Sequence, residues 1–474
     1  EDLDNLIAEG EKRNIGLMFD MVFNHTSTSH EWFRRALAGE KKYQDYYIFK
    51  EGAPDQPPTN WQSKFGGSAW EYVSSLGKWY LHLFDVTQAD LNWKNPEVRE
   101  ELKEVIRFWK AKGVKGFRFD VVNLISKPEI WEDDFEGDGR KFYTDGPYVH
   151  EYLKELVRDT GIEDYVTVGE MSSTTLEHCI RYSGAEEKEL SMCFNFHHLK
   201  VDYKDGNKWE LMEPDYMELK VIFEKWQMGM QRGNAWNALF WCNHDQPRIV
   251  SRFGNEGEYW KESAKMLAGM IHLMRGTPYI YQGEEIGMTN PHYTSIEQYA
   301  DVESRNYYEI LLNEGKTKEE ALEILAARSR DNSRTPMQWT DERYCGFSDT
   351  KPWIPVSDNF EKINVKKQKQ DRDSILEFYK KLIMLRKEKE VIARGNIEFM
   401  EVENAGVLAY TRCLDKQKLL VCCNFRDVES QMEFTQEWKS GRKILGNYEE
   451  NHKNNYKVLT LRPYEIIVLE KGEE

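Results

Sequence analysis

The chain has 474 residues, enough for two or three domains with a large hydrophobic core. Its 82 acidic and 65 basic side chains give a formal charge of −17, which argues against nucleic acids and anionic membranes as partners because both require a basic face. No apolar run reaches transmembrane length and no signal peptide is visible, so a cytoplasmic location is expected. Seven scattered cysteines have no metal-ligand spacing and are expected to be small buried side chains.

The first 94 residues contain one helix, one strand and a long irregular stretch. Apolar residues at helical spacing predict a helix at about 2–13, and the strand 15–23 follows. Residues 26–94 lose all long periodicity and are rich in Pro, Gly, Trp and Tyr. An irregular stretch of this length inside a compact protein is typical of a functional or small inserted subdomain.

Residues 95–286 alternate regularly between helices and strands. Asn95 and Pro96 form an N-terminal helix signal, and Gly113 is placed to end that helix. Further helices are predicted at about 148–160, 174–183, 215–232 and 258–275, and strands at 114–122, 165–171, 190–196, 237–244 and 278–286. Alternation with continuously apolar strands indicates a parallel sheet covered on both faces.

The last third of the chain changes character at about residue 395. A second excursion, 288–371, has a helical patch at 318–329, and a final helix is predicted at 373–390. Short alternating strands at 396–402, 407–413, 418–424 and 464–470 then predict a separate antiparallel β domain.

The predicted architecture is a (β/α)8 TIM barrel that lacks its first two strands in this chain. Six parallel strands are counted, a closed barrel needs eight, and the chain begins within a helix without an initial Met. The expected domains are the barrel (1–25 and 95–393), an inserted irregular subdomain after the third barrel strand (26–94), and the C-terminal all-β domain (394–474).

Three of the predicted strands end in a carboxylate: Asp120, Glu170 and Asp245. Because the carboxyl ends of parallel strands meet at one rim of a barrel, these side chains are expected in one cleft. Retaining glycoside hydrolysis needs two such groups about 5–5.5 Å apart, one to attack the anomeric carbon and one to protonate the leaving oxygen. Anionic neighbours would raise the pKa of the acid, whereas Arg118 is expected to hold Asp120 ionised.

Several motifs strengthen this interpretation. The runs DMVFNH (20–25), GFRFD (116–120), GE (169–170) and NHD (243–245) resemble the four short sequence regions of the α-amylase family of glycoside hydrolases, and QADLN (88–92) resembles its fifth. The runs YQGEEIGMTN (281–290) and RDNSRTPMQW (330–339) resemble the oligo-1,6-glucosidase branch of that family.

The resemblance implies a role for each matching residue. Asp120 would be the nucleophile, Glu170 the general acid/base and Asp245 the stabiliser of the transition state. Contacts to the sugar would come from His25, Arg118, His244 and Arg330. A structural alternative for Arg330 and Arg334 is that they form ion pairs that fix a loop.

A further run, SMCFNFHHLKVDY (191–203), resembles members of the branch that cleave trehalose 6-phosphate to glucose and glucose 6-phosphate. Its basic residues follow a strand and are expected near the mouth of the cleft, where a phosphate needs cationic donors. The predicted phosphate ligands are His198, Lys200 and Lys208, and the predicted partner is a small disaccharide phosphate. A solvated loop with incidental charge is the structural alternative.

Other activities are compatible with the same motifs. An oligo-1,6-glucosidase acting on isomaltose-type ends is the principal alternative, and sucrose or trehalose isomerisation is a third. A non-catalytic, transporter-associated relative is disfavoured because all three acids are present and no anchor is visible in these 474 residues. The family chemistry requires no cofactor and no catalytic metal. A structural divalent cation stays open, although the N-terminal loop that holds it in many relatives is absent from this chain.

Overall fold

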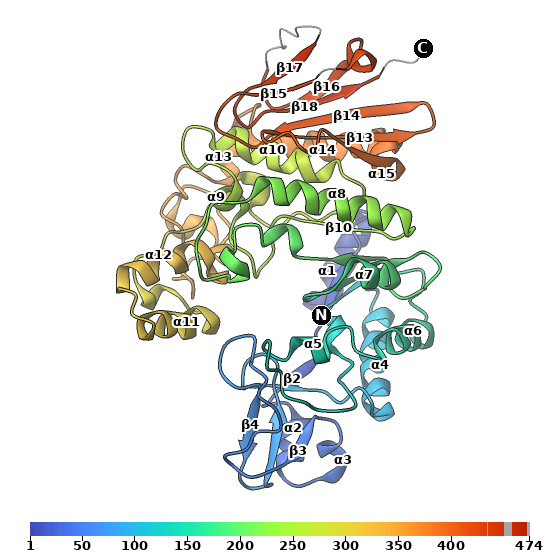
Figure 1. The fold of residues 1–474 in the computed structure, drawn as a ribbon, viewed down its shortest axis with the longest axis vertical. Helices are drawn as coiled ribbons and strands as arrows, with labels where there is room; N and C mark the ends of the chain where they lie inside the picture. Colours follow the sequence, from blue (N-terminus) through green and yellow to red (C-terminus); the bar gives the residue numbers. More distant parts are fainter. Residues whose placement is uncertain (434, 450–456, 472–474) are drawn as a thin grey trace. The chain divides into compact units, whose positions relative to one another are not determined.

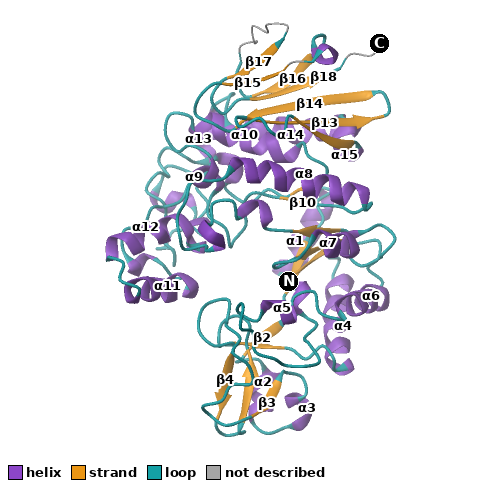
Figure 2. Ribbon diagram, in the orientation of Figure 1, coloured by secondary structure: helices purple, strands orange, loops and turns teal. Residues whose placement is uncertain are grey.

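The computed structural model describes residues 1–433, 435–449 and 457–471 (Figures 1 and 2). The chain forms two compact units, residues 1–196 with 232–237, and residues 197–231 with 238–474. The units are described one at a time.

The first unit is built on a four-stranded parallel sheet with the order β1-β7-β8-β9. Its strands are β1 (Met18–Met21), β7 (Gly116–Phe119), β8 (Val166–Glu170) and β9 (Met192–Phe194). Its helices are α1 (Asp2–Lys12), α4 (Pro96–Ala111), the short α5 (Arg140–Tyr143), α6 (Val149–Thr160) and α7 (Leu176–Ser183). The four parallel strands that the alternation predicts for this part of the chain are confirmed.

Helix α4 shows how local sequence positions the strand that follows it. The Asn95 side chain accepts a hydrogen bond from the backbone N–H of Glu97 at 2.9 Å, and Pro96 is the first helical residue, where its missing N–H costs nothing. Gly113 follows the helix with φ +100°, a conformation that favours glycine. This turn directs the chain into β7, which ends one residue before Asp120.

The inserted stretch 26–94 is a small aromatic subdomain with short elements. It contains α2 (Glu31–Leu37), α3 (Lys41–Gln44) and an antiparallel sheet of β3 (Phe49–Glu51), β5 (Lys78–Leu81) and β4 (Trp70–Val73). The strands β2 (His25–Ser27) and β6 (Gln88–Asp90) pair at its base. Its core includes Trp61, Trp70 and Trp79. The elements span only three to seven residues, which explains why no long periodicity is visible in the sequence.

The second unit is mainly helical before its C-terminal sheet. Its helices are α8 (Tyr216–Arg232), α9 (Ile249–Phe253), α10 (Trp260–His272), α11 (Val302–Asn313), α12 (Lys318–Arg328), α13 (Val365–Gln370), α14 (Ile375–Glu388) and α15 (Glu390–Arg394). Two short parallel strands, β10 (Ala238–Leu239) and β11 (Thr277–Pro278), pair with each other.

The predicted strands 237–244 and 278–286 are both too long. β10 ends at Leu239, and the carbonyl oxygen of Phe240 bonds to the His198 ring at 2.9 Å instead of to a neighbouring strand. After β11, Gly283 and Gly287 adopt positive φ and enclose a single 3₁₀ turn. Asp245 therefore lies in a loop six residues beyond β10, not at the end of a strand.

The C-terminal antiparallel sheet is confirmed. Its five strands follow the order β12 (Asn396–Met400), β13 (Val407–Leu414), β14 (Gln417–Asn424), β18 (Ile466–Glu470) and β16 (Arg442–Gly446). A separate pair is formed by β15 (Ser430–Glu433) and β17 (Val458–Leu461). The sheet packs on α10 in the same compact unit. The Tyr410 hydroxyl donates to the carbonyl of Met270 at 2.7 Å, and the Arg412 guanidinium donates to that of Leu273 at 2.5 Å.

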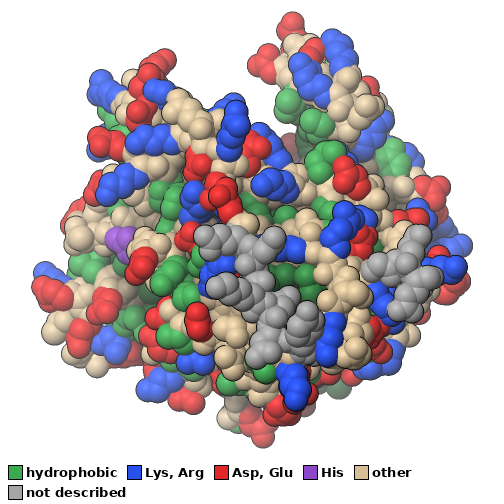
Figure 3. Space-filling model, turned by 90° about the horizontal axis from the view of Figure 1, so that it is seen from above, with side chains coloured by type: hydrophobic (Ala, Val, Ile, Leu, Met, Phe, Trp, Pro, Cys, Tyr) green, Lys and Arg blue, Asp and Glu red, His purple; other side chains and the backbone are tan. Residues whose placement is uncertain are grey.

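The composition also has structural counterparts. All seven cysteines are unpaired thiols, and six of them are buried, as expected. No helix in the described part of the chain is long and apolar enough to cross a membrane. On the face seen in Figure 3, acidic and basic side chains are interspersed and do not form a broad patch of one sign.

Candidate active site

Arg118 joins carboxylates from three neighbouring parallel strands of the first unit. Its Nη1 donates to both oxygens of Asp20 on β1, at 2.6 and 2.5 Å, and to Oδ1 of Asp120 at 2.8 Å. Its Nη2 forms an ion pair with Oε2 of Glu170, the last residue of β8. The register explains the cluster, because Asp20 and Arg118 are direct partners in the sheet. We call these four residues the Arg118 cluster.

The electrostatics of the cluster are set mainly by burial. Burial raises the pKa of Asp120 above its usual range, and the nearby charge of Asp20 raises it further. The charge and hydrogen bond of Arg118 lower the pKa of Asp120, but they do not cancel the effect of burial. Glu170 is only 7% exposed. The geometry thus places two partly desolvated carboxylates on one guanidinium, an arrangement suited to acid–base and nucleophilic chemistry.

His25 begins β2 and is held in a buried polar network. Its Nε2 lies 2.9 Å from the Gln88 amide nitrogen, and its ring packs against that of Phe84. Burial lowers the pKa of His25, although the charges of Asp90 and Asp120 oppose that shift. The effect of Asp120 indicates that His25 lies near the Arg118 cluster. A neutral imidazole here is suited to hydrogen bonding with a sugar hydroxyl.

A buried ion pair beside this histidine was not predicted. Lys127 Nζ lies 2.8 Å from Oδ2 of Asp90 and donates to the side-chain oxygen of Asn24 at 2.8 Å. Asn24 also lies 3.3 Å from His25 Nδ1. Both Asn24 and Asp90 belong to the two motifs that resemble family regions, but only the folded chain reveals Lys127 as their partner.

In the second unit, Asp245 lies between two arginines. Arg334 Nη2 donates to its Oδ1 at 2.6 Å, and Arg330 Nη1 lies 3.4 Å from the same atom. Both arginines also contact Asp301, a residue that the sequence did not single out. Burial raises the pKa of Asp245, but His244, Arg330 and Arg334 together hold it below its usual range. Asp245 is therefore a stable anion.

The three predicted phosphate ligands have different environments. His198 is 5% exposed, its Nε2 bonds to the Phe240 carbonyl, and burial lowers its pKa to about 4. A buried neutral ring does not fit a cationic phosphate donor, so the prediction for His198 is not kept. Lys208 Nζ pairs with Glu303 at 2.8 Å, and Arg330 Nε lies 3.2 Å from the same Glu303 oxygen. Lys200 is exposed and follows the 3₁₀ turn His197–Leu199.

The structure thus groups the predicted site residues in two sets. The first unit brings together His25, Arg118, Asp120 and Glu170. The second brings together His244, Asp245, Arg330 and Arg334. In the described residues, no group of three or more His, Cys, Asp or Glu side chains has an arrangement that could hold a metal ion.

Family models match almost the whole chain. The model "Alpha amylase, catalytic domain" matches residues 1–395, and "Maltogenic Amylase, C-terminal domain" matches residues 397–468. The chain belongs to the α-amylase family of glycoside hydrolases.

Individual relatives are also closely similar to this chain. The trehalose-6-phosphate hydrolase of Escherichia coli (strain K12) is 51% identical over 475 residues, which cover 98% of this chain and 85% of the relative. The oligo-1,6-glucosidase of Bacillus cereus is 44% identical over 478 residues, which cover 99% of this chain and 85% of the relative. The crystal structure of Bacillus licheniformis trehalose-6-phosphate hydrolase matches with a TM-score of 0.94 and 50% identity, covering 100% of this chain and 86% of the other.

Proposed function

We propose that this α-amylase family member is a retaining glycosidase that hydrolyses trehalose 6-phosphate to glucose and glucose 6-phosphate. The Arg118 cluster carries the chemical part of the proposal, because one guanidinium contacts both Asp120 and Glu170, which come from neighbouring strands. The substrate part is supported by two relatives named trehalose-6-phosphate hydrolase, which are 51% and 50% identical to this chain.

In the proposed reaction, a carboxylate oxygen of Asp120 attacks the anomeric carbon of the glucosyl unit that carries no phosphate. Glu170 gives its proton to the glycosidic oxygen, so the bond to that oxygen breaks and glucose 6-phosphate leaves. Glu170, now a carboxylate, takes a proton from water, which attacks the glucosyl ester and releases glucose and the free Asp120 carboxylate. Burial raises the pKa of Asp120, so the proposed nucleophile ionises at a higher pH than an exposed aspartate does.

The other residues of the proposed site act on charge and orientation. Arg118 orients both carboxylates, and His25 is assigned to a sugar hydroxyl. In the second unit, we assign stabilisation of the positively charged transition state to Asp245, whose pKa is held low. His244 and Arg330 are assigned to sugar contacts, and Arg334 to fixing the Asp245 carboxylate.

We propose Lys200 and Lys208 as ligands of the substrate phosphate, and we no longer include His198. Each charge-assisted contact contributes roughly 1.5–3 kcal/mol, so two of them would favour the phosphorylated disaccharide by about 10²–10⁴-fold. No catalytic metal is proposed for this reaction.

An oligo-1,6-glucosidase is the second candidate, and one observation favours it. Lys208 is already paired with Glu303, which reduces the positive charge available to a phosphate. Hydrolysis of trehalose 6-phosphate, trehalose and isomaltose by the same preparation distinguishes the two, with Asp120→Asn as the inactive control. A kcat/KM for isomaltose above that for trehalose 6-phosphate would reject the proposed substrate, and wild-type rates in Asp120→Asn would reject the proposed nucleophile.

A further inference from the structure

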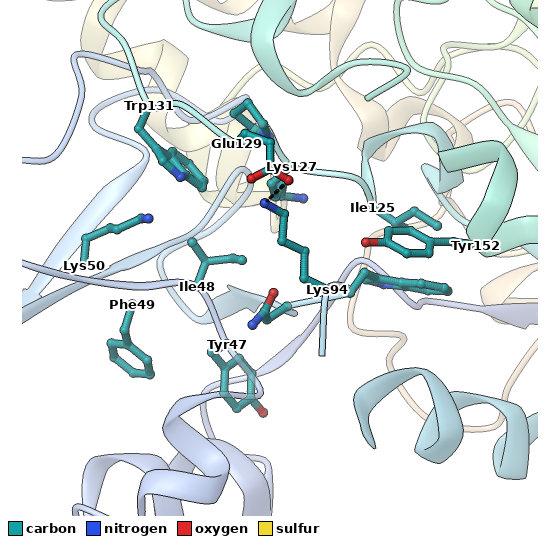
Figure 4. A pocket seen from close by; sticks show the side chains of 13 residues that line it. Tyr47, Ile48, Phe49, Lys50, Lys94, Ile125, Lys127, Glu129, Trp131 and Tyr152 are labelled. Carbon is teal, nitrogen blue, oxygen red and sulfur yellow. Dashed lines mark ion pairs between the residues drawn. The ribbon is translucent and has the colours of Figure 1, made fainter. Parts of the chain in front are cut away.

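The first unit contains a cavity of about 200 Å³ whose wall carries three lysines (Figure 4). It lies between strand β3 of the inserted subdomain, the segment 92–94 and the loop 125–131. We call it the lysine cavity. Its charged side chains are Lys50, Lys94, Lys127 and Glu129, and Trp131 and Tyr152 supply aromatic walls. None of its lining residues belongs to the Arg118 cluster.

The three lysines are not equally compensated by acidic groups. Lys127 is neutralised by its buried ion pair with Asp90. Lys94 reaches Glu129 at 2.7 Å, and Figure 4 shows this pair across the cavity. Both partners are exposed, at 41% and 59%, so water competes with the pair and its contribution is small.

Lys50 has no acidic partner among the described residues. Its ammonium group lies 4.7 Å from the centre of the Trp131 ring, a cation–π contact that leaves donors free to bind a ligand. Burial lowers the pKa of Lys50, and the positive charge of Lys94 lowers it further. The two ammonium groups thus affect each other across one cavity, and Glu129 supplies the only carboxylate among the described residues of its wall.

We propose that the lysine cavity binds a phosphate-sized oxyanion between Lys50 and Lys94. A doubly charged oxyanion accepts charge-assisted hydrogen bonds from both ammonium groups and relieves their mutual repulsion. The volume favours a small ligand, because pockets for drug-sized molecules measure about 300–1,000 Å³. The ligand is free inorganic phosphate or the phosphate group of a small monoester. The proposal does not depend on the reaction proposed above, since the lining residues take no part in it.

Binding of inorganic phosphate can be measured by isothermal titration calorimetry of the full chain in phosphate-free buffer at low salt. All chains carry Lys208→Gln, which removes a ligand of the proposed substrate site. Lys50→Gln and Lys94→Gln should each weaken binding by about ten- to hundredfold. Lys50→Arg keeps the positive charge and should keep most of the affinity. Glu129→Gln removes the competing carboxylate and should tighten binding by about two- to fivefold.

Lys115→Gln is the matched control, because Lys115 is also an exposed lysine paired with a single glutamate, Glu11, at 3.1 Å. It should leave phosphate affinity unchanged. Glucose 6-phosphate replaces inorganic phosphate in a second series, and a titration that depends on Lys50 there would identify a monoester as a ligand of the cavity. Equal phosphate affinity with and without Lys50, or no binding by any chain at millimolar phosphate, would overturn the proposal.

Discussion

Nη1 of Arg118 lies 2.8 Å from Oδ1 of Asp120, two residues further along the chain and just beyond the end of β7. The same guanidinium contacts Asp20 on one neighbouring strand and Glu170 on the other. One cation therefore contacts both the proposed nucleophile and the proposed acid, which come from different strands. This arrangement makes the proposed roles of Asp120 and Glu170 separable by experiment.

Replacing the two carboxylates should have different consequences. Asp120→Asn removes the proposed nucleophile and should lower kcat for every substrate by about 10⁴-fold or more. Glu170→Gln should lower kcat on trehalose 6-phosphate by about 10²–10⁴-fold. On p-nitrophenyl α-glucoside its first step should be much less affected, because that leaving group needs no protonation. Burst kinetics on both substrates provide the test, and equal losses on both would contradict the assignment of Glu170 as the acid.

Loss of the Arg118 charge should shift the pH profile as well as the rate. The pKa of Asp120 is already raised by burial, and the nucleophile must be ionised, so activity falls as pH falls through that pKa. Arg118→Gln removes the opposing charge and should move the acid limb of kcat/KM upward by about one pH unit or more. Arg118→Lys keeps the charge and should shift the limb less. An acid limb that stays in place in Arg118→Gln would show that Asp120 does not set it.

Lys208 and His198 should differ in what their replacement changes. Lys208→Gln should reduce the preference for trehalose 6-phosphate over trehalose by about 10–100-fold. His198→Asn should leave that preference unchanged and lower the free energy of unfolding by about 1–3 kcal/mol, because the buried Phe240 carbonyl loses its donor. Substrate preference and urea unfolding are measured for both variants. If His198→Asn changed the preference for trehalose 6-phosphate over trehalose and Lys208→Gln did not, the phosphate ligand would be His198 and not Lys208.

Glu284 should make stability depend on pH. It is fully buried, accepts a hydrogen bond from the Tyr379 hydroxyl at 2.8 Å, and burial raises its pKa to about 7. The folded chain therefore keeps this proton up to about pH 7, whereas the unfolded chain releases it near 4.5. Stability should fall as pH rises between these values, by on the order of 3 kcal/mol.

Glu284→Gln keeps the acceptor for Tyr379 but cannot ionise. Urea unfolding at pH 5 and pH 8 should show a smaller loss of stability in this variant than in the wild type. The other titrating groups are common to both proteins and cancel in the comparison. An identical loss in the two proteins would show that Glu284 does not hold its proton in the folded chain.

The features that follow from local sequence were predictable. The cap at Asn95, the helix α4 and the carboxylates at the ends of β7 and β8 depend on residues close to one another in the chain. Apolar runs were less informative. Phe240, Trp241 and Cys242 are all buried, as in a strand, yet they follow β10 in a loop, and the Phe240 carbonyl bonds to the His198 ring.

The partners of the site residues could not be read from the sequence. Asp20 lies 98 positions before Arg118 and meets it only through the register of β1 and β7. Asp301, the N-cap of α11, contacts Arg330 and Arg334, which lie 29 and 33 positions further along the chain. The burial of His198 depends on the packing of Phe223, Phe240 and Trp241 around its ring. Long-range packing of this kind leaves no local signal.

The contacts of Tyr410 and Arg412 with the end of α10 bear on how the chain can be divided. The Tyr410 hydroxyl and the Arg412 guanidinium donate to the carbonyls of Met270 and Leu273, which have no hydrogen-bond donor within the helix because they lie at its C-terminal end. Gly269 meets Ile466 so closely that an added methyl group would clash, at 2.3 Å. A protein that ends at residue 395 would lose the C-terminal sheet that packs on this helix. Hybrids made from related enzymes should therefore inherit α10 and the C-terminal sheet from the same parent.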